Sequence, residues 1–256
     1  MKGFTAFFKK EIKELIRTKR LMILLGIFIL VGIMNPAIAK LTPLLFEKMS
    51  DEFASQGITL SAIKVSAVDS WSQFAKNAPT VLIVTLIMFS GIYTSEYSKG
   101  TLIPLLTKGL SRSSVVLSKL TVMLLTWSIG IWLCYVITYF YSDFYWDNSV
   151  VKELFFAAFC WWLFGVFMIS IIVFFSSFAN SGIQVMLCTG AAYFVISLLG
   201  MYSKIKNDLP IRLTESVSLY KGESVPGDYF VAAIITAILS VALILLSLPI
   251  THKRQI

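Results

Sequence analysis

The run LFFAAFCWWLFGVFMISIIVFFSSF, residues 154–178, decides the fold class. It contains no Asp, Glu, Lys or Arg, and it is longer than the roughly 20 helical residues that cross the hydrocarbon core of a bilayer. A run of this length and composition is typical of a membrane-spanning helix rather than of a buried strand or core helix. The sequence therefore predicts that the chain crosses the membrane here.

Five further runs predict spans of the same kind, at residues 21–39, 78–95, 120–141, 183–201 and 229–250. None of the six runs contains an acidic or basic side chain. The chain of 256 residues is 57% hydrophobic and only 14% charged, whereas a soluble domain carries about 25% charged residues. We therefore expect an all-α integral membrane protein, with residues 1–256 forming a single transmembrane domain of six spanning helices.

The charged residues indicate which side of the membrane each loop occupies. Residues 1–20, 96–119 and 251–256 together carry 13 Lys or Arg against three acids, and the rest of the chain carries 9 against 11. Lys and Arg concentrate in the cytoplasmic segments of membrane proteins. We therefore expect both termini and the 96–119 segment in the cytoplasm. This topology explains the net charge of +8 without a nucleic-acid partner.

Residues 4–20 predict an amphipathic helix in the headgroup plane of the bilayer, with Lys and Arg on its polar face. The apolar face carries Phe4, Phe8, Ile12, Leu15 and Ile16. The basic start, the apolar run and Ala-Ile-Ala at 37–39 also imitate a cleavable signal peptide. The long polar leader, its two glutamates and the full length of the apolar run favour an uncleaved first span.

The two largest outer loops, 40–77 and 202–228, predict short helices that cap the outer face, because their apolar residues recur near a helical period. These residues are Leu60, Ile63, Ala67, Trp71 and Phe74 in the first loop, and Leu213, Val217 and Tyr220 in the second. We expect the tryptophans of the third and fourth spans mainly at the membrane interface or against lipid, with lining of an apolar substrate pathway as the alternative. They are Trp127, Trp132, Trp161 and Trp162.

Several kinds of chemistry are excluded or disfavoured. No Gly is followed directly by Lys, so the phosphate-binding loop GxxxxGK[ST] is absent. The spans offer no acid or base for ion coupling, and no Ser–His, paired-Asp or metal constellation for an enzyme. Cys134, Cys160 and Cys188 lie within apolar runs, where we expect buried apolar residues, and His252 is expected in solvent. The sequence therefore predicts no catalytic, cofactor or metal site in this chain.

The polar stretch SEYSKGTLIPLLTKGLSRSSVVLSK, residues 95–119, separates the second and third spans. Thr101 is a candidate helix cap, Pro104 suits a first turn, and Gly109 suits a left-handed end. They predict a short helix over 101–108, whose apolar side carries Leu102, Ile103 and Leu106 with Leu105 at its edge. A helix of this length is marginal in water, so its apolar side needs either the inner leaflet or a groove on a cytoplasmic partner.

This stretch resembles the segment that follows the second span in permease subunits of the type 2 ABC exporter family. The shared pattern is an acidic residue, Gly-Thr, a Leu-rich segment, then Ser-Arg and a Lys leading into the third span. FFKKEIKELIRTKRLMILL at 7–25 is similar to the cytoplasmic interfacial helix of that family. The chain departs from the commonest pattern at Gly109-Leu110, where a Pro is frequent, and at Ser118, where a Gly is frequent. These departures concern the subfamily to which the chain would belong rather than the family.

The resemblance implies that the 101–108 helix is a coupling helix that docks on a separate ATPase subunit, which binds ATP and Mg. It implies that Glu96 and Arg112 are polar anchors and that Gly100 and Thr101 form the turn and the helix cap. It further implies a docking face made of leucines, which are Leu102, Leu105 and Leu106. It also implies a second permease subunit, identical or related, and export of a peptide or lipid-like substrate across a bacterial plasma membrane. An ion-coupled carrier, a membrane scaffold and a membrane enzyme are the alternatives.

Overall fold

The computed structural model describes residues 2–54 and 64–253, which form helices and turns without a strand. Six helices are long and apolar enough to cross a membrane, so the predicted all-α fold is confirmed. These helices are α2 (Arg20–Ala54), α3 (Ala67–Ser90), α6 (Arg112–Tyr145), α7 (Leu154–Ser176), α8 (Gly182–Leu199) and α10 (Phe230–Lys253). The shorter helices are α1 (Lys2–Arg17), α4 (Thr94–Ser98), α5 (Ile103–Thr107) and α9 (Val217–Tyr220), with 3₁₀ turns η1 (Asn148–Val150), η2 (Lys206–Asp208), η3 (Pro210–Thr214) and η4 (Pro226–Tyr229).

Three of the long helices extend well beyond the predicted apolar runs. Helix α2 continues to Ala54, α3 begins at Ala67, and α6 covers Arg112–Tyr145. An apolar run marks the part of a helix that crosses hydrocarbon, whereas the helix itself ends where its backbone groups find a cap. Trp71 and Phe74 therefore belong to the first turns of α3 rather than to a separate outer helix. Leu60 and Ile63 lie outside the described residues.

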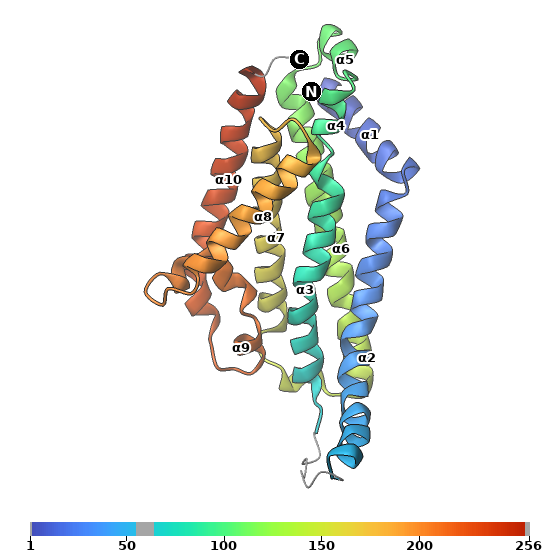
Figure 1. Ribbon diagram of the computed structural model, residues 1–256, viewed down its shortest axis with the longest axis vertical. Helices are drawn as coiled ribbons and strands as arrows, with labels where there is room; N and C mark the ends of the chain where they lie inside the picture. Colours follow the sequence, from blue (N-terminus) through green and yellow to red (C-terminus); the bar gives the residue numbers. More distant parts are fainter. Residues whose placement is uncertain (1, 55–63, 254–256) are drawn as a thin grey trace.

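Helix α7 lies at the centre of the bundle, with α3, α6, α8 and α10 packed around it and α2 against α3 and α6 (Figure 1). It is apolar on all sides, as a helix with neighbours on every side requires. A Cβ atom at Gly165 would lie 2.1 Å from the Trp127 side chain, so this glycine lets α6 and α7 approach closely. Trp127 and Trp161 are buried in the bundle, and the expectation that they contact lipid or the interface is wrong.

A buried polar network joins α2, α3 and α6. Pro36 lacks an N–H group, which leaves the Gly32 carbonyl without its usual partner in the α2 helix. The Thr138 hydroxyl donates to that carbonyl at 3.2 Å and accepts from the Asn35 amide at 3.0 Å, and Asn77 donates to Asn35 at 2.8 Å. The proline is therefore accommodated because the neighbouring helices supply the missing hydrogen bonds.

Residues 202–229 form a packed cap over the ends of α3, α7 and α10 that lie away from the two termini, and this loop was predicted to form a cap. The Leu213, Leu219 and Tyr220 side chains are fully buried in it. The Trp161 indole donates to the Ser216 hydroxyl at 2.9 Å, which fixes the cap to α7.

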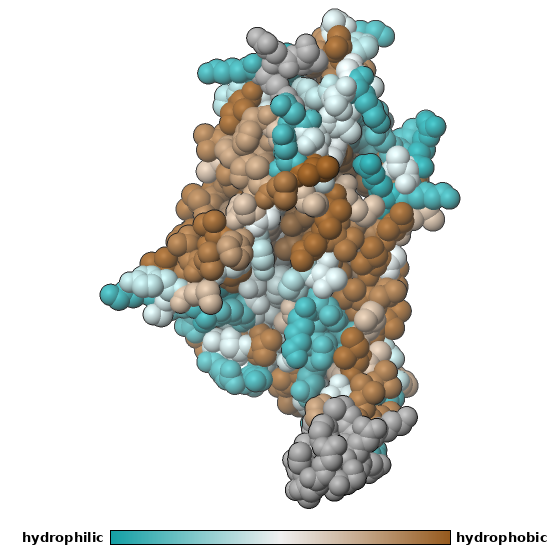
Figure 2. Space-filling model, viewed as in Figure 1, coloured by the Kyte–Doolittle hydropathy of each residue, from teal (hydrophilic) through white to brown (hydrophobic). Residues whose placement is uncertain are grey.

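The remaining helices leave broad apolar surfaces exposed, as expected of faces that contact lipid. Apolar residues cover the middle of the molecule in Figure 2, and polar residues gather toward its two ends. Helix α8 is inclined away from α7 in Figure 1, and only Val185 and Thr189 of its 18 residues are buried. An apolar groove lies between α8 and its neighbours α3 and α7.

Candidate partner-docking site and its charge cluster

The segments that the charge count places in the cytoplasm meet at one end of the bundle (Figure 1). The Arg112 guanidinium at the start of α6 donates to the carbonyls of Thr251 and His252 at the end of α10, at 3.1 and 3.2 Å. The Ser118 hydroxyl of α6 donates to the Phe4 carbonyl of α1 at 3.3 Å. Arg112 therefore stabilises the end of α10 within this chain. Its predicted role toward a partner stays a prediction.

Two glycines give α4 and α5 their ends. Gly100 has φ +64°, and the Thr101 N–H donates back to the Glu96 carbonyl at 3.2 Å. Gly109 has φ +91°, and the Leu110 N–H donates back to the Leu105 carbonyl at 3.2 Å. Both ends are Schellman motifs, which need a left-handed residue that glycine supplies without a Cβ penalty. The left-handed end predicted at Gly109 is confirmed.

The start and length of the short helix differ from the prediction. Helix α5 covers only Ile103–Thr107, and Leu102 rather than Thr101 occupies its N-cap position, without a side-chain capping bond. The Thr101 hydroxyl instead lies 3.4 Å from the Glu96 carbonyl. Thr101 follows the Gly100 turn directly, so its side chain closes the end of α4 rather than opening α5.

The leucines of α5 divide between the inside of the chain and its surface. Leu102 is 1% exposed and packs with Phe7 of α1 and Val115 of α6, and Leu106 borders this cluster. Ile103 is 47% exposed and Leu105 is 36% exposed. Leu102 therefore anchors the helix to its own chain and does not belong to an exposed docking face. The exposed apolar side consists of Ile103 and Leu105.

Helix α1 packs on α6 through a face that carries an acid at its centre. Phe7, Glu11 and Leu15, each four residues apart, are buried, whereas Ile16 is 51% exposed. The predicted apolar face included Ile16 and omitted Phe7. The prediction was wrong at these two residues because the buried face also contains the Glu11 carboxylate, and a face with a carboxylate does not look apolar in the sequence.

Glu11 belongs to a charge cluster formed by Lys10, Glu11 and Glu14 of α1, Glu96 of α4 and Lys119 of α6. The Lys119 ammonium is 1% exposed and lies 2.9 Å from a carboxylate oxygen of Glu11 and 2.9 Å from one of Glu96. Lys10 pairs with Glu14 at 2.8 Å and also with Glu96 and Glu11. The cluster therefore ties α4, which leads into α5, to both α1 and α6.

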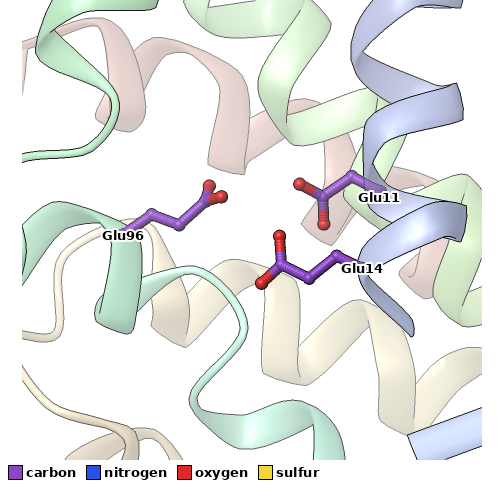
Figure 3. Close-up of side chains that lie close together, drawn as sticks. All are labelled: Glu11, Glu14 and Glu96. Carbon is purple, nitrogen blue, oxygen red and sulfur yellow. The ribbon is translucent and has the colours of Figure 1, made fainter. Parts of the chain in front are cut away.

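The three carboxylates of the cluster converge on one small volume, where one oxygen of each lies within 4.8 Å of the others (Figure 3). Such a group resembles a cation site. The ammonium groups of Lys10 and Lys119 already lie at ion-pair distance from these carboxylates, so lysines of this chain supply the positive charge. The arrangement is that of a structural ion-pair network.

The network also sets the ionisation of its outer members. Burial disfavours the Lys10 ammonium, but hydrogen bonds to Glu14, Glu96 and Glu11 outweigh this effect and raise the pKa of Lys10 above its ordinary value. Burial also disfavours the Glu14 carboxylate, but the hydrogen bond from Lys10 holds the pKa of Glu14 below its ordinary value. Both side chains are therefore charged at neutral pH, and the ion pairs are maintained.

Sequence reasoning chose Glu96 but missed its partners, Glu11 and Lys119. A signal for them was present in the charge count, because the basic segments 1–20, 96–119 and 251–256 carry 13 Lys or Arg and only three acids, which are Glu11, Glu14 and Glu96. Isolated acids in a basic surface are candidates for ion pairing. The sequence contained no signal that Lys119 would be buried rather than exposed at the start of a span.

A second feature is an apolar groove between α3, α7 and α8, with a volume of about 210 Å³. Leu82 and Leu86 of α3, Phe164 and Met168 of α7 and Met186 of α8 lie along it. No acidic or basic side chain lines the groove among the described residues. Its walls suit a hydrophobic molecule rather than an ion.

Comparison with known proteins gives one family. The model of the family described as "ABC-2 family transporter protein" matches residues 5–252, nearly the whole chain. No curated protein matches the sequence. The matched region includes all six spanning helices, the charge cluster and the groove.

Proposed function

The chain belongs to the ABC-2 family of transporter proteins, and we propose that it is the membrane subunit of an exporter that moves an amphipathic or hydrophobic substrate out of the cytoplasm or inner leaflet. Membership makes it a transport subunit rather than the ATPase, and implies an ATPase partner. In our proposal the ATPase holds ATP and Mg, a second permease subunit completes the transporter, and the chain crosses a bacterial plasma membrane with both termini in the cytoplasm.

The observation that carries the proposal is the exposed side of α5. Ile103 and Leu105 remain exposed on a one-turn helix that projects from the charged end of the bundle. Two large apolar side chains at the tip of a helix are typical of an anchor for a groove on a protein partner. Leu102 and Glu96 hold this tip on α1 and α6, so the docking face is presented by a fixed support.

This support suggests how movement of the ATPase reaches the membrane. A displacement of α5 acts on α4 directly and, through the Glu96–Lys119 and Glu11–Lys119 pairs, on α6 and α1. Helix α6 is continuous from Arg112 to Tyr145, so a push at its start is carried along its full length. Packed helices respond to such a push by rigid-body shifts.

The substrate pathway in this proposal includes the apolar groove. It opens beside α8, in which only Val185 and Thr189 are buried, and in our proposal α8 shifts relative to α3 and α7 when the substrate passes. Its uncharged walls support a hydrophobic cargo or the hydrophobic part of an amphipathic one.

The test is a charge placed on the exposed side of α5. We expect Leu105→Asp and Ile103→Asp to weaken binding of the ATPase subunit about tenfold or more, because a carboxylate is desolvated in an apolar groove. Copurification and titration of the ATPase onto the purified chain measure this loss. Leu102→Asp is unsuitable, because Leu102 is buried within the chain.

Thr107→Asp is the matched control, since it adds the same charge to an exposed polar position of the same helix. It is expected to bind the ATPase nearly as well as the natural chain. Unchanged binding by Leu105→Asp and Ile103→Asp would contradict docking through α5. Transport that persists without ATP and stops when an ion gradient is removed would instead favour the ion-coupled carrier.

A further inference from the structure

We propose that Thr189 determines specificity in the apolar groove, and that the groove takes a hydrophobic molecule with a neutral hydrogen-bonding group, such as a hydroxyl, ester or amide. The inference rests on the proposed function, because it treats the groove as part of the transport pathway. It adds to that function a ligand class and the residue that recognises it.

The Thr189 hydroxyl is buried without a hydrogen-bond partner among the described residues. Thr189 is 3% exposed, lines the groove, and its Oγ1 atom contacts no acceptor or donor at hydrogen-bond distance. Several other threonines in the spans donate to the carbonyl four residues earlier, as Thr85 does to Val81 at 2.7 Å and Thr126 to Val122 at 2.8 Å. A buried polar group without a partner is unusual and points to a ligand that supplies one.

The depth of Thr189 restricts the ligand group that can meet it. Thr189 is the eighth of the 18 residues of α8, so it lies near the middle of this span. A charged group at this depth would lose its hydration, and no side chain of opposite charge lines the groove among the described residues to compensate it. A neutral carbonyl or hydroxyl can exchange a hydrogen bond with Thr189 without this loss.

The space beside Thr189 is open enough for such a ligand. Gly190 also lines the groove, and a Cβ atom at Gly190 would meet no heavy atom within 4 Å. Phe164 and Met168 of α7 line the groove opposite α8. The ligand therefore has a largely apolar wall along its length, with the buried Thr189 hydroxyl partway along it and the Tyr193 side chain also on the wall.

Quenching of Trp161 fluorescence by brominated probes tests the inference, because Trp161 lines the groove. The full chain is placed in nanodiscs with methyl dibromostearate, which has an ester, with dibromooctadecane, which has no hydrogen-bonding group, or with ionised dibromostearate. We expect the ester to bind about fivefold more tightly than the hydrocarbon, the difference that one neutral hydrogen bond makes. Trp161→Phe identifies the part of the quenching that comes from this groove.

Two substitutions at Thr189 separate recognition from shape. Thr189→Val keeps the size of the side chain and is expected to abolish the preference for the ester over the hydrocarbon. Thr189→Ser keeps the hydroxyl and is expected to retain the preference. A preference that survives in Thr189→Val, or tighter binding of ionised dibromostearate than of the ester, would overturn the inference.

Two glycine variants test the place of binding. Gly190→Leu fills open space in the groove and is expected to weaken both neutral probes. Gly26→Leu adds the same side chain on α2, where a Cβ atom also meets no heavy atom within 4 Å, and is expected to leave binding unchanged. Equal effects of the two variants on Trp161 quenching would place the probes elsewhere and overturn the inference.

A last arm separates a transported molecule from bilayer lipid. Dibrominated phosphatidylcholine carries its esters near the membrane surface, away from the depth of Thr189. We therefore expect the methyl ester to displace this lipid from the groove, and failure of displacement would overturn the inference. The assay contains neither ATPase nor nucleotide. If the preference for the ester depends on Thr189 but the chain recruits no ATPase, the result would therefore contradict the proposed function alone. If the chain recruits an ATPase but the preference for the ester does not depend on Thr189, the result would contradict this inference alone.

Discussion

Lys119 is buried at the start of a membrane-spanning helix, where an isolated ammonium group would be strongly disfavoured. It is tolerated because Glu11 and Glu96 bring two carboxylates within 2.9 Å from two other elements. Its ammonium also lies near the Tyr93 and Phe7 rings, 5.8 and 5.6 Å from their centroids. One side chain therefore holds α1, α4 and α6 in register with one another.

Lys119→Met is expected to destabilise the protein by about 3–5 kcal/mol, because it removes the buried cation between Glu11 and Glu96. Among the described residues, it leaves Lys10 as the only cation paired with the three carboxylates of the cluster. The measurement is thermal unfolding of the detergent-solubilised chain. Adding Glu11→Gln to Lys119→Met is expected to recover part of the loss, since it removes one of the buried negative charges that Lys119 no longer balances. Lys108→Met makes the same change at an exposed lysine and serves as control. Equal unfolding temperatures for the two Met variants would contradict a structural role of the cluster.

At the scale of elements, the spans were predictable and the charge cluster was not. An apolar run such as 154–178 is a local property of the sequence, and it predicts a spanning helix without knowledge of the segments that pack against it. The Lys119 pairs depend on three segments that are up to 108 residues apart meeting at one point. The same reason explains Leu102, whose burial depends on Phe7 and Val115 rather than on the α5 sequence.

The left-handed end of α5 is an element-level feature that can be tested directly. Gly109→Ala is expected to speed hydrogen exchange in segment 102–110 by about 5- to 30-fold, because a Cβ atom in a left-handed conformation costs roughly 1–2 kcal/mol. A Cβ atom at Gly109 meets no heavy atom within 4 Å, so the effect would come from the backbone alone. Gly91→Ala, at a residue with φ −93° and equally open surroundings, is the control. Similar exchange in both variants would show that the glycine end does not stabilise α5.

At the scale of the whole molecule, the distribution of charge and the position of α5 agree. The basic segments 1–20, 96–119 and 251–256 were grouped from the sequence by composition alone, and contacts of Arg112 and Ser118 bring them together at one end. The 202–229 cap, whose Lys and Arg are balanced by an equal number of Asp and Glu, covers the bundle at the opposite end. The proposed docking helix at the basic end and a closed cap at the other support the proposal of a transporter driven from the cytoplasm.

This orientation predicts which residues a membrane-impermeant maleimide reaches in intact cells. Ser98 and Ser203 are both exposed serines, Ser98 at the basic end and Ser203 at the start of the 202–229 cap. In a chain with its native cysteines replaced, Ser203→Cys is expected to react in intact cells, and Ser98→Cys only after permeabilisation. The reason is that translocation of the strongly basic segments is disfavoured, whereas the 202–228 loop carries no excess of Lys and Arg. Labelling of Ser98→Cys from outside would reverse the topology and place α5 beyond the reach of a cytoplasmic ATPase.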